Sequence, residues 1–224
     1  MTVLSVIVPV LNEAAGIVPT LQALAPWRAA GHEVIVVDGG SHDATAALAA
    51  PLATAVLHSG RGRARQMNTG AAAATGEVLL FLHADTTLPA GAAAAVLQAV
   101  AGGARWGRFD VAIIGRSRWL PVVATLMNLR SRATGIATGD QALFVQRALF
   151  TQLGGYAELP LMEDIEICRR LRTQARPACL RLKATTSGRR WDQRGAWRTI
   201  VLMWRLRWRY WRGESPDALA RAYR

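Results

Sequence analysis

A chain of 224 residues with 51% hydrophobic content can bury one full core, so its composition excludes a disordered or fibrous protein. The formal net charge of +12 comes almost entirely from arginine. Such a charge indicates an anionic partner, which could be nucleotide phosphates, a nucleic acid or an acidic membrane surface. Charge alone does not choose among these three.

The cysteines and the apolar segments indicate a cellular compartment. Cys168 and Cys179 are too few for a disulfide framework, so we expect free thiols in a reducing environment. The first apolar run meets Pro9 and Asn12 too early for a secretory signal. No apolar stretch reaches about 18 residues, the length of a membrane-spanning helix. The sequence therefore predicts a cytoplasmic protein, either free or resting peripherally on the inner face of the membrane.

The first 103 residues alternate between strand and helix patterns. The first strand is expected to be central in the sheet, and Gly31 is expected to close the helix after it. The apolar run 78–82 could by periodicity be a buried helix, but its length and its neighbours favour a strand. This alternation is typical of a parallel sheet and a nucleotide-binding half. We predict strands at residues 4–11, 33–37, 53–57 and 78–82, and helices at residues 15–30, 66–75 and in a segment ending near residue 50.

Polar groups follow three of these strands. They are Asn12-Glu13, Asp38 and His83-Ala84-Asp85. The carboxyl ends of parallel strands open on one crevice, where ligands bind in open α/β sheets. On an extended chain His83 and Asp85 would point to the same side, which is a metal-ligand spacing. The alternative is that residues 85–87 only cap the helix after Pro89.

A glycine-rich basic loop occupies residues 60–68 and runs into a helix N-terminus. Backbone amides, the helix dipole and guanidinium groups at such a place suit a diphosphate. The Gly-Lys-Ser/Thr ending of a phosphate-binding Walker loop is absent. The alternative is a solvated basic turn.

The second half of the chain, residues 104–188, contains further strand and helix patterns. Residues 105–114 are expected to form one or two strands leading out of the sheet, and residues 139–144 a turn into another strand. The segment 116–132 has an apolar centre between basic ends, and we favour an ordinary packed helix, broken near Pro121. Residues 161–171 are expected to form an amphipathic helix with Glu163 and Asp164 in its first turn, where acids complement the helix dipole. This structural role would by itself explain both acids, without catalysis.

The last 36 residues, from 189 to 224, contain ten arginines, three acids and five of the eight tryptophans. On a helix, one strip of Leu202, Leu206 and Tyr210 can dock on the domain while a second strip stays exposed. Tryptophan beside arginine is typical of a helix at a membrane interface. The alternative is a packed helix with solvated arginines. The second strip consists of Trp197, Val201, Trp204, Trp208 and Trp211.

Taken together, these motifs resemble those of glycosyltransferase family 2, and the likeness is greatest to a small bacterial branch. The resemblance implies one domain with the GT-A fold, an α/β fold whose mostly parallel central sheet is flanked by helices, here with a C-terminal amphipathic helix. The segments that carry it are residues 6–13, 36–43, 61–70, 80–85, 139–141, 154–156 and 162–166.

The resemblance also implies roles on the donor side. The metal, Mn²⁺ or Mg²⁺, would bind an Asp-x-Asp motif, which here reads His83-Ala84-Asp85. The metal would therefore rest mainly on Asp85, with His83 as a second ligand or a ribose contact. Arg61 or Arg65 would stabilise the diphosphate. Arg190 and Trp191 resemble a basic-aromatic motif that holds diphosphate and acceptor, although the preceding glutamine is missing. The residues expected at the base and ribose are Pro9, Asn12, Glu13 and Asp38.

The resemblance assigns the acceptor site to residues 104–188. On that side it implies that Asp164 is the catalytic base, with Asp140 and Glu163 as the other candidates. The predicted enzyme is an inverting hexosyltransferase that moves a sugar from a UDP- or GDP-linked donor to a hydroxyl of an unidentified acceptor, lipid-linked or soluble. One alternative is a sugar nucleotidyltransferase, which normally carries its basic loop after the first strand and not the third. A nucleic-acid-binding module would leave the strand-end acids unexplained, so no nucleic acid is expected.

Overall fold

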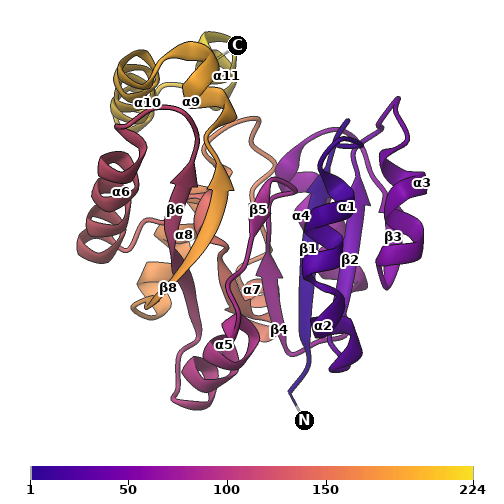
Figure 1. Ribbon diagram of the computed structural model, residues 1–224. Helices are drawn as coiled ribbons and strands as arrows, with labels where there is room; N and C mark the ends of the chain where they lie inside the picture. Colours follow the sequence, from indigo (N-terminus) through magenta and orange to yellow (C-terminus); the bar gives the residue numbers. More distant parts are fainter. Residues whose placement is uncertain (1, 224) are drawn as a thin grey trace.

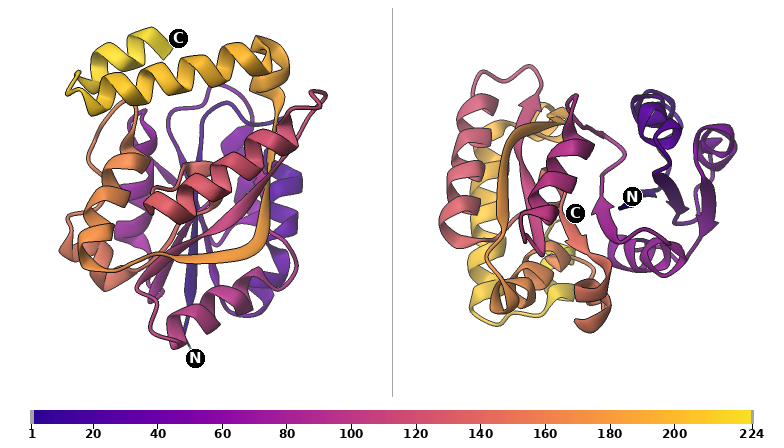
Figure 2. Two further views of the ribbon diagram at one scale, coloured as in Figure 1. Left: turned by 90° about the vertical axis from the view of Figure 1, so that its left-hand side faces the viewer. Right: turned by 90° about the horizontal axis from the view of Figure 1, so that it is seen from below.

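A curled, mixed β-sheet forms the centre of the molecule (Figures 1 and 2). The computed structural model describes residues 2–223, with the side chains in that range except those of Arg190, Arg194 and Ala196. Within this range the sheet has eight strands, in the order β3-β2-β1-β4-β7-β6-β8-β5. The strands are β1 (Leu4–Val10), β2 (Glu33–Asp38), β3 (Ala55–His58), β4 (Val78–Phe81), β5 (Thr86–Thr87), β6 (Trp106–Ile114), β7 (Phe144–Gln146) and β8 (Ala178–Ser187).

The amino-terminal half of the sheet is parallel, as predicted. β1 lies between β2 and β4 and runs parallel to both, and β3 pairs parallel with the outer side of β2. All seven residues of β1 are buried. A strand that is buried on both faces reads as a continuous apolar run, which explains why the pattern lacked alternation.

Helices cover both faces of the sheet (Figure 2). Val6 and Val8 of β1 face one core, and Ile7 between them faces the other. The first core is completed by α1 (Ile17–Ala23), α2 (Ala25–Ala29), α3 (Thr45–Ala49), which continues into η1 (Ala50–Leu52), and α5 (Ala92–Ala101). The second is completed by α4 (Arg63–Ala73), α7 (Arg147–Gln152) and α8 (Glu163–Gln174).

The single helix predicted at residues 15–30 is instead two short helices, α1 and α2, which meet at Leu24. Pro26 explains the break, because it has no N–H to continue a helix from the preceding turn. It stands in the first turn of α2, where that N–H is not needed.

The second half of the sheet differs from the prediction. β6 does not lead out of the sheet but lies inside it, antiparallel to β7 and parallel to β8. β8 was not predicted, since its residues are largely half-buried or exposed and give no apolar pattern. The short β5 pairs with β8, and Thr86 and Thr186 are joined by a hydrogen bond of 3.0 Å. This pairing brings the segment after the His83-Ala84-Asp85 turn to the far edge of the sheet.

The helix predicted at residues 116–132 is α6 (Leu120–Thr134), and it is not broken at Pro121. Pro121 lies in its first turn, the position where a proline is tolerated. Leu120, Val123 and Ala124 pack against β6, but the opposite side of the helix is exposed. The prediction of an ordinary packed helix therefore holds for only one of its faces.

The chain ends in α9 (Arg189–Arg194), α10 (Ala196–Trp211) and α11 (Pro216–Tyr223), which lie together at the top of Figure 1. Leu206 of α10 and Leu219 of α11 are fully buried and form a small core with Met162. Met162 immediately precedes α8. The carboxyl-terminal helices are thus packed against the start of the helix that carries Glu163 and Asp164.

One buried side chain ties α4 to the ends of two central strands. Nε2 of Gln66 donates hydrogen bonds to the carbonyl oxygens of Val10 (2.7 Å) and Val37 (2.8 Å). Gly70, one turn further along α4, approaches so closely that a Cβ there would come within 2.5 Å of the Ile7 side chain. These contacts set the position of α4 against the carboxyl ends of β1 and β2.

We therefore expect Gln66→Leu to lower the free energy of unfolding by about 1 to 3 kcal/mol, because two buried hydrogen bonds from the side-chain amide, each worth roughly 0.5 to 1.5 kcal/mol, are lost. Urea denaturation followed by circular dichroism measures the change. Gln22→Leu, on the exposed side of α1, is the matched control. Equal stability of the two variants would contradict the assigned role of Gln66.

Candidate donor and acceptor site

The loops that follow β1 and β2 are joined by hydrogen bonds into one wall of the site. Asn12 donates its backbone N–H to Oγ of Ser41 (2.9 Å) and accepts the N–H of His42 on its side-chain oxygen (2.9 Å). Glu13 donates its N–H to Oγ1 of Thr45 (2.8 Å). The Asn12 side chain therefore braces the two loops. Pro9 is buried inside β1, in register with Val37.

Asp38 ends β2 at the same wall and is almost fully buried. Its carboxylate accepts the backbone N–H groups of Gly40 (3.3 Å) and Ser41 (3.0 Å) and the hydroxyl of Ser41, and Nδ1 of His58 lies 3.6 Å away. These bonds shape the turn after β2. A structural role accounts for Asp38 by itself, and a contact with a nucleotide remains a prediction.

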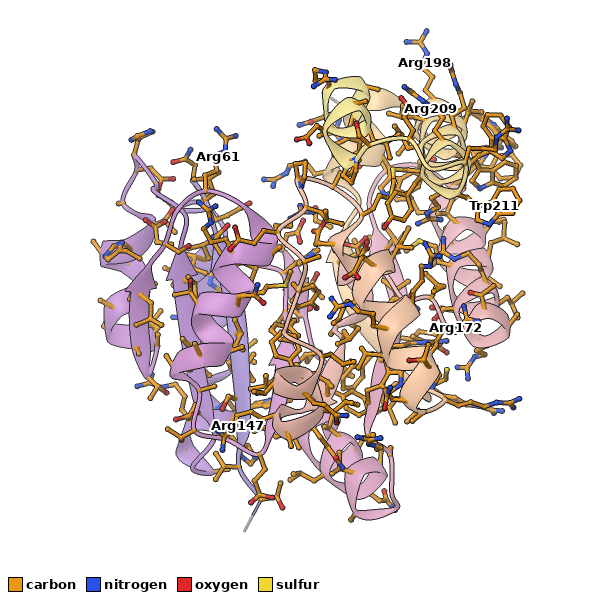
Figure 3. All side chains as sticks on the ribbon, turned by 180° about the vertical axis from the view of Figure 1, so that it is seen from behind. Arg61, Arg147, Arg172, Arg198, Arg209 and Trp211 are labelled. Atoms are coloured by element: carbon orange, nitrogen blue, oxygen red, sulfur yellow. The ribbon has the colours of Figure 1, made fainter. Side chains whose placement is uncertain are left out.

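The basic loop leads into α4, whose first-turn N–H groups have no side-chain cap. Uncapped N–H groups at a helix N-terminus suit an anion. Arg65 is drawn aside by an ion pair with Glu158 (2.9 Å), and Arg61 projects outward from the loop (Figure 3). Arg63 instead lines a cavity with His83 and Asp164. Sequence reasoning missed Arg63, although its place in the first turn of the helix was a usable signal.

The segment His83-Ala84-Asp85 is a turn in the structure and not an extended chain, so its two polar side chains have different neighbours. Nδ1 of His83 lies 3.4 Å from Oδ1 of Asp140. The imidazole packs so closely on Gly139 that a Cβ there would approach it to 2.2 Å. Asp85 is exposed and close to Glu13. The spacing of the two residues therefore does not bring them together as the extended-chain argument predicted.

Glu13 lies where the wall formed by the loops after β1 and β2 meets the carboxyl-terminal helices. Burial raises its pKa above the ordinary value, and Asp85 and Asp43 act in the same direction. Arg189, whose Nη2 lies 3.8 Å from Oε2 of Glu13, acts in the opposite direction. Arg189 begins α9, so this contact connects the first loop of the chain to its end.

Of the two residues predicted after Arg189, only one can be described. The Arg190 side chain lies outside the described part of the structure. Trp191 is half-buried and packs against the apolar cluster of Val111, Leu120 and Val123. Its neighbour Asp192 accepts the backbone N–H groups of Arg116 (2.8 Å) and Ser117 (3.1 Å). In this arrangement Trp191 joins α9 to α6, and a donor contact remains a prediction.

Asp164 lies partly buried in the first turn of α8. Burial and then the charge of Glu163 raise its pKa to about 7. The N–H groups of Ile165 (2.7 Å) and Gly139 (3.3 Å) donate to its carboxylate and lower the pKa, as does His83. A carboxylate with a pKa near neutrality is suited to accept a proton during a reaction.

The other acids of this group are arranged around Asp164. Glu163 is buried at the first position of α8, and Asp140 is half-buried in η2 (Gly139–Gln141) opposite His83. Burial also raises the pKa of Tyr156 well above its ordinary value. Asp164, Glu163, Tyr156, His83 and Arg63 line one cavity of about 30 Å³, which is room for one or two water molecules.

Three residues in or next to the segments of this site have a strained backbone conformation. In the described chain, the non-glycine residues with positive φ are Asn12 (55°), Ala142 (45°) and Met162 (71°). One is a predicted site residue, one follows η2, and one immediately precedes Glu163. Such conformations cost free energy and concentrate at functional sites. They were not visible in the sequence, because none of these residues is glycine.

No group of three or more histidine, cysteine, aspartate or glutamate side chains within residues 2–223 is arranged to hold a metal ion. Asp85 alone offers an exposed carboxylate at the end of the β4 loop. A single carboxylate is compatible with Mg²⁺ or Mn²⁺ where a phosphate supplies further oxygen ligands. The residues present therefore fit a divalent cation that binds Asp85 and a diphosphate together.

The sequence model of glycosyl transferase family 2 matches residues 5–149, well over half of the chain. The chain belongs to glycosyltransferase family 2. This confirms the family predicted from the motifs. The match includes the parallel half of the sheet, the basic loop, the His83-Ala84-Asp85 turn and η2.

Curated relatives of this glycosyltransferase include PGL/p-HBAD biosynthesis glycosyltransferases of Mycobacterium bovis and Mycobacterium tuberculosis, each 37% identical over 91 residues. The similarity covers 38% of this chain and only 36% of the length of those relatives. The sequence similarity is therefore limited to little more than a third of each protein.

Solved structures show the GT-A fold of the glycosyltransferase. The mannosyltransferase PcManGT from Pyrobaculum calidifontis, in complex with GDP-Man and Mn²⁺, aligns with a TM-score of 0.70 and 25% identity over 99% of this chain and 69% of that one. S. aureus TarS 1–349 in complex with UDP-GlcNAc gives 0.67 and 21% over 83% and 58%. Glucosyl-3-phosphoglycerate synthase of Mycobacterium tuberculosis with Mn²⁺, UDP and its product gives 0.64 and 19% over 90% and 78%.

The raised pKa of Asp164 makes stability depend on pH. The folded protein binds this proton more tightly than the unfolded chain, so the group favours folding below about pH 4, and this contribution is lost as the pH rises to about 7. Asparagine does not titrate. Between about pH 4 and 8, Asp164→Asn should therefore gain stability relative to the wild type, measured by denaturant unfolding. A constant difference across this range would show that burial does not raise the pKa of Asp164.

Proposed function

We propose that this glycosyltransferase moves a hexose from a UDP- or GDP-linked donor to an acceptor hydroxyl, with inversion at the anomeric carbon. The observation that carries the proposal is the small cavity lined by both Arg63 and Asp164. Arg63 belongs to an uncapped helix N-terminus that suits a diphosphate. Asp164 is a partly buried carboxylate whose pKa is raised to about 7. A leaving-group site and a base site thus share one space.

In this proposal the nucleotide lies along the wall made by the loops after β1 and β2. Asp38 and Asn12 define the shape of that wall through their hydrogen bonds. The diphosphate lies at the N-terminus of α4, where Arg63 takes the role predicted for Arg61 or Arg65. The complexes of PcManGT with GDP-Man and of TarS with UDP-GlcNAc support a nucleoside-diphosphate sugar as the donor class.

A divalent cation would bind Asp85 together with the diphosphate oxygens. When bound, it would neutralise negative charge on the leaving diphosphate. Complexes of related folds with Mn²⁺ and Mg²⁺ support this assignment. His83 is turned toward Asp140, so we assign it to the sugar and acceptor side and not to the metal.

The reaction is a single displacement. Asp164 accepts the proton of the acceptor hydroxyl, and the hydroxyl oxygen bonds to the anomeric carbon on the face opposite the diphosphate. The bond from that carbon to the phosphate oxygen breaks, and its electron pair leaves with the diphosphate. Arg63 and the first N–H groups of α4 stabilise the charge that develops there. A carboxylate with a pKa of about 7 can take up a proton near neutral pH.

Two other functions receive less support. A sugar nucleotidyltransferase would carry its basic loop after the first strand, but this loop connects β3 to α4. A nucleic-acid-binding module would not need a partly buried carboxylate with a raised pKa on the same cavity as Arg63 of an uncapped helix N-terminus. The acceptor can be a soluble or a lipid-linked hydroxyl compound. The exposed apolar side chains of α6 and α10 favour a lipid-linked acceptor.

Donor binding gives the first test. We expect UDP or GDP to raise the melting temperature, and Mn²⁺ to increase that rise, since a ligand at about 100 times its Kd adds roughly 2.7 kcal/mol of stability. Asp85→Asn should keep the fold and lose the part that depends on Mn²⁺. A thermal-shift panel of UDP, GDP, CDP and dTDP, with and without Mn²⁺, measures both effects.

The neighbouring arginines provide a matched control for donor binding. Arg63→Gln should weaken nucleotide affinity about tenfold or more, the effect of losing a charged hydrogen-bond donor. Arg65→Gln loses only an exposed ion pair with Glu158 and should bind nearly as the wild type does. A stronger loss in Arg65→Gln than in Arg63→Gln would place the diphosphate elsewhere on the loop.

Turnover gives the second test. Asp164→Asn keeps the shape of the side chain but removes its basicity, so turnover should fall by roughly 10² to 10⁴ with nucleotide affinity almost unchanged. Initial rates with a transferable donor, together with calorimetry of UDP or GDP, measure the two quantities. An Asp164→Asn enzyme with the wild-type rate would transfer the role of base to Asp140 or Glu163.

A further inference from the structure

The outer side of α10 exposes a continuous apolar stripe. Trp204 is 67% exposed and Trp211 is 77% exposed, although the other side of the same helix carries the fully buried Leu206. In Figure 3 Trp211 projects from the molecule on the side where α6 lies. A row of large exposed aromatic side chains indicates a surface that binds a membrane or another molecule. The stripe consists of Trp197, Val201, Trp204, Trp208 and Trp211.

A second stripe lies on α6 and meets the first. Trp119, Val122, Leu126 and Leu129 are exposed at helical spacing, on the side opposite the residues that pack on β6. The rings of Trp119 and Trp197 lie 5.5 Å apart, so the two stripes join at this pair. Figure 2 shows α6 and α10 on the same side of the molecule, diverging from that junction. We call the two stripes together the α6–α10 face.

The two helices of this face carry basic but no acidic side chains. Arg116, Arg118, Arg198 and Arg205 are exposed around the face, and the guanidinium of Arg212 lies 5.1 Å from the centre of the Trp208 ring. An open groove of about 350 Å³ on α10 has Trp197 and Val201 beside Arg198 and Arg205. Such a groove can take an apolar chain next to an anionic group.

We propose that the α6–α10 face is a membrane-binding surface that lies in the headgroup region of an anionic bilayer. Tryptophan favours that region, and arginines beside an apolar stripe bind anionic lipid. No helix among residues 2–223 is long and apolar enough to cross a membrane. A second copy of the chain fits the face poorly, because two such faces would oppose arginine to arginine without an acid between them.

The proposal differs from binding by α10 alone, because α6 contributes half of the face. The surface is also held in a fixed relation to the candidate site. Asp192 of α9 binds the backbone ahead of α6, and Arg189 of α9 reaches Glu13 at the wall formed by the loops after β1 and β2. Protein bound through this face would therefore present one side of the site region to the bilayer at a constant distance.

Vesicle binding tests the proposal without any substrate, so its outcome is independent of the proposed reaction. The wild type should co-sediment with vesicles of phosphatidylcholine and phosphatidylglycerol, bind vesicles of phosphatidylcholine alone weakly, and be released at high salt. Leu126→Gln with Leu129→Gln on α6 should reduce the partition coefficient about tenfold or more, as should Trp204→Gln with Trp208→Gln on α10. Circular dichroism and melting curves check that the variants are folded.

Two matched controls lie on other surfaces. Leu48→Gln removes an exposed leucine from α3, and Arg147→Gln removes a guanidinium at the opposite end of the molecule from α10 (Figure 3). Neither should change binding, whereas Arg205→Gln should weaken it on anionic vesicles. Unchanged binding in the α6 variant would overturn the two-helix face. So would absence of vesicle binding, or a dimer in sedimentation velocity that the α6 and α10 variants abolish.

Discussion

The side-chain amide of Gln66 connects α4, β1 and β2, the three elements that position the wall formed by the loops after β1 and β2. From within α4 it donates to Val10, the last residue of β1, and to Val37, the residue before the end of β2, and it can do so only because Gly39 leaves room for it. A buried amide with two backbone acceptors permits little change in the angle between helix and sheet. The uncapped N-terminus of α4, with Arg63 in its first turn, is thereby held beside the loops that carry Asn12 and Asp38.

The opposite wall is organised by the left-handed backbone of Met162. This conformation turns the chain so that Met162 enters the core formed with α10 and α11, while Glu163 and Asp164 begin α8 inside the site. The packing that partly buries Asp164 also raises its pKa. The carboxyl-terminal helices therefore hold the residue that immediately precedes Glu163 and Asp164, even though their exposed residues lie on the outer surface.

Much of the fold followed from local patterns. The strands of the parallel half, the helix with Glu163 and Asp164, and the basic loop before a helix were all predicted close to their observed positions. The predictions of secondary structure were wrong for segments whose conformation depends on more than their own apolar pattern. β8 has no apolar periodicity and exists because β6 and β5 supply its hydrogen-bond partners. The helix expected at residues 15–30 is divided, since Pro26 can stand only in a first turn.

By itself, the sequence determined the family, the fold class and the groups that reach the carboxyl end of the sheet, because apolar period and strand-end polarity are local properties. Only the tertiary structure decided which of these groups meet. It turned Arg65 to Glu158 and left Arg63 toward the site, and it directed His83 to Asp140 instead of Asp85. The physical reason is that side-chain direction, burial and pKa depend on neighbours far away in the chain, which no local spacing specifies.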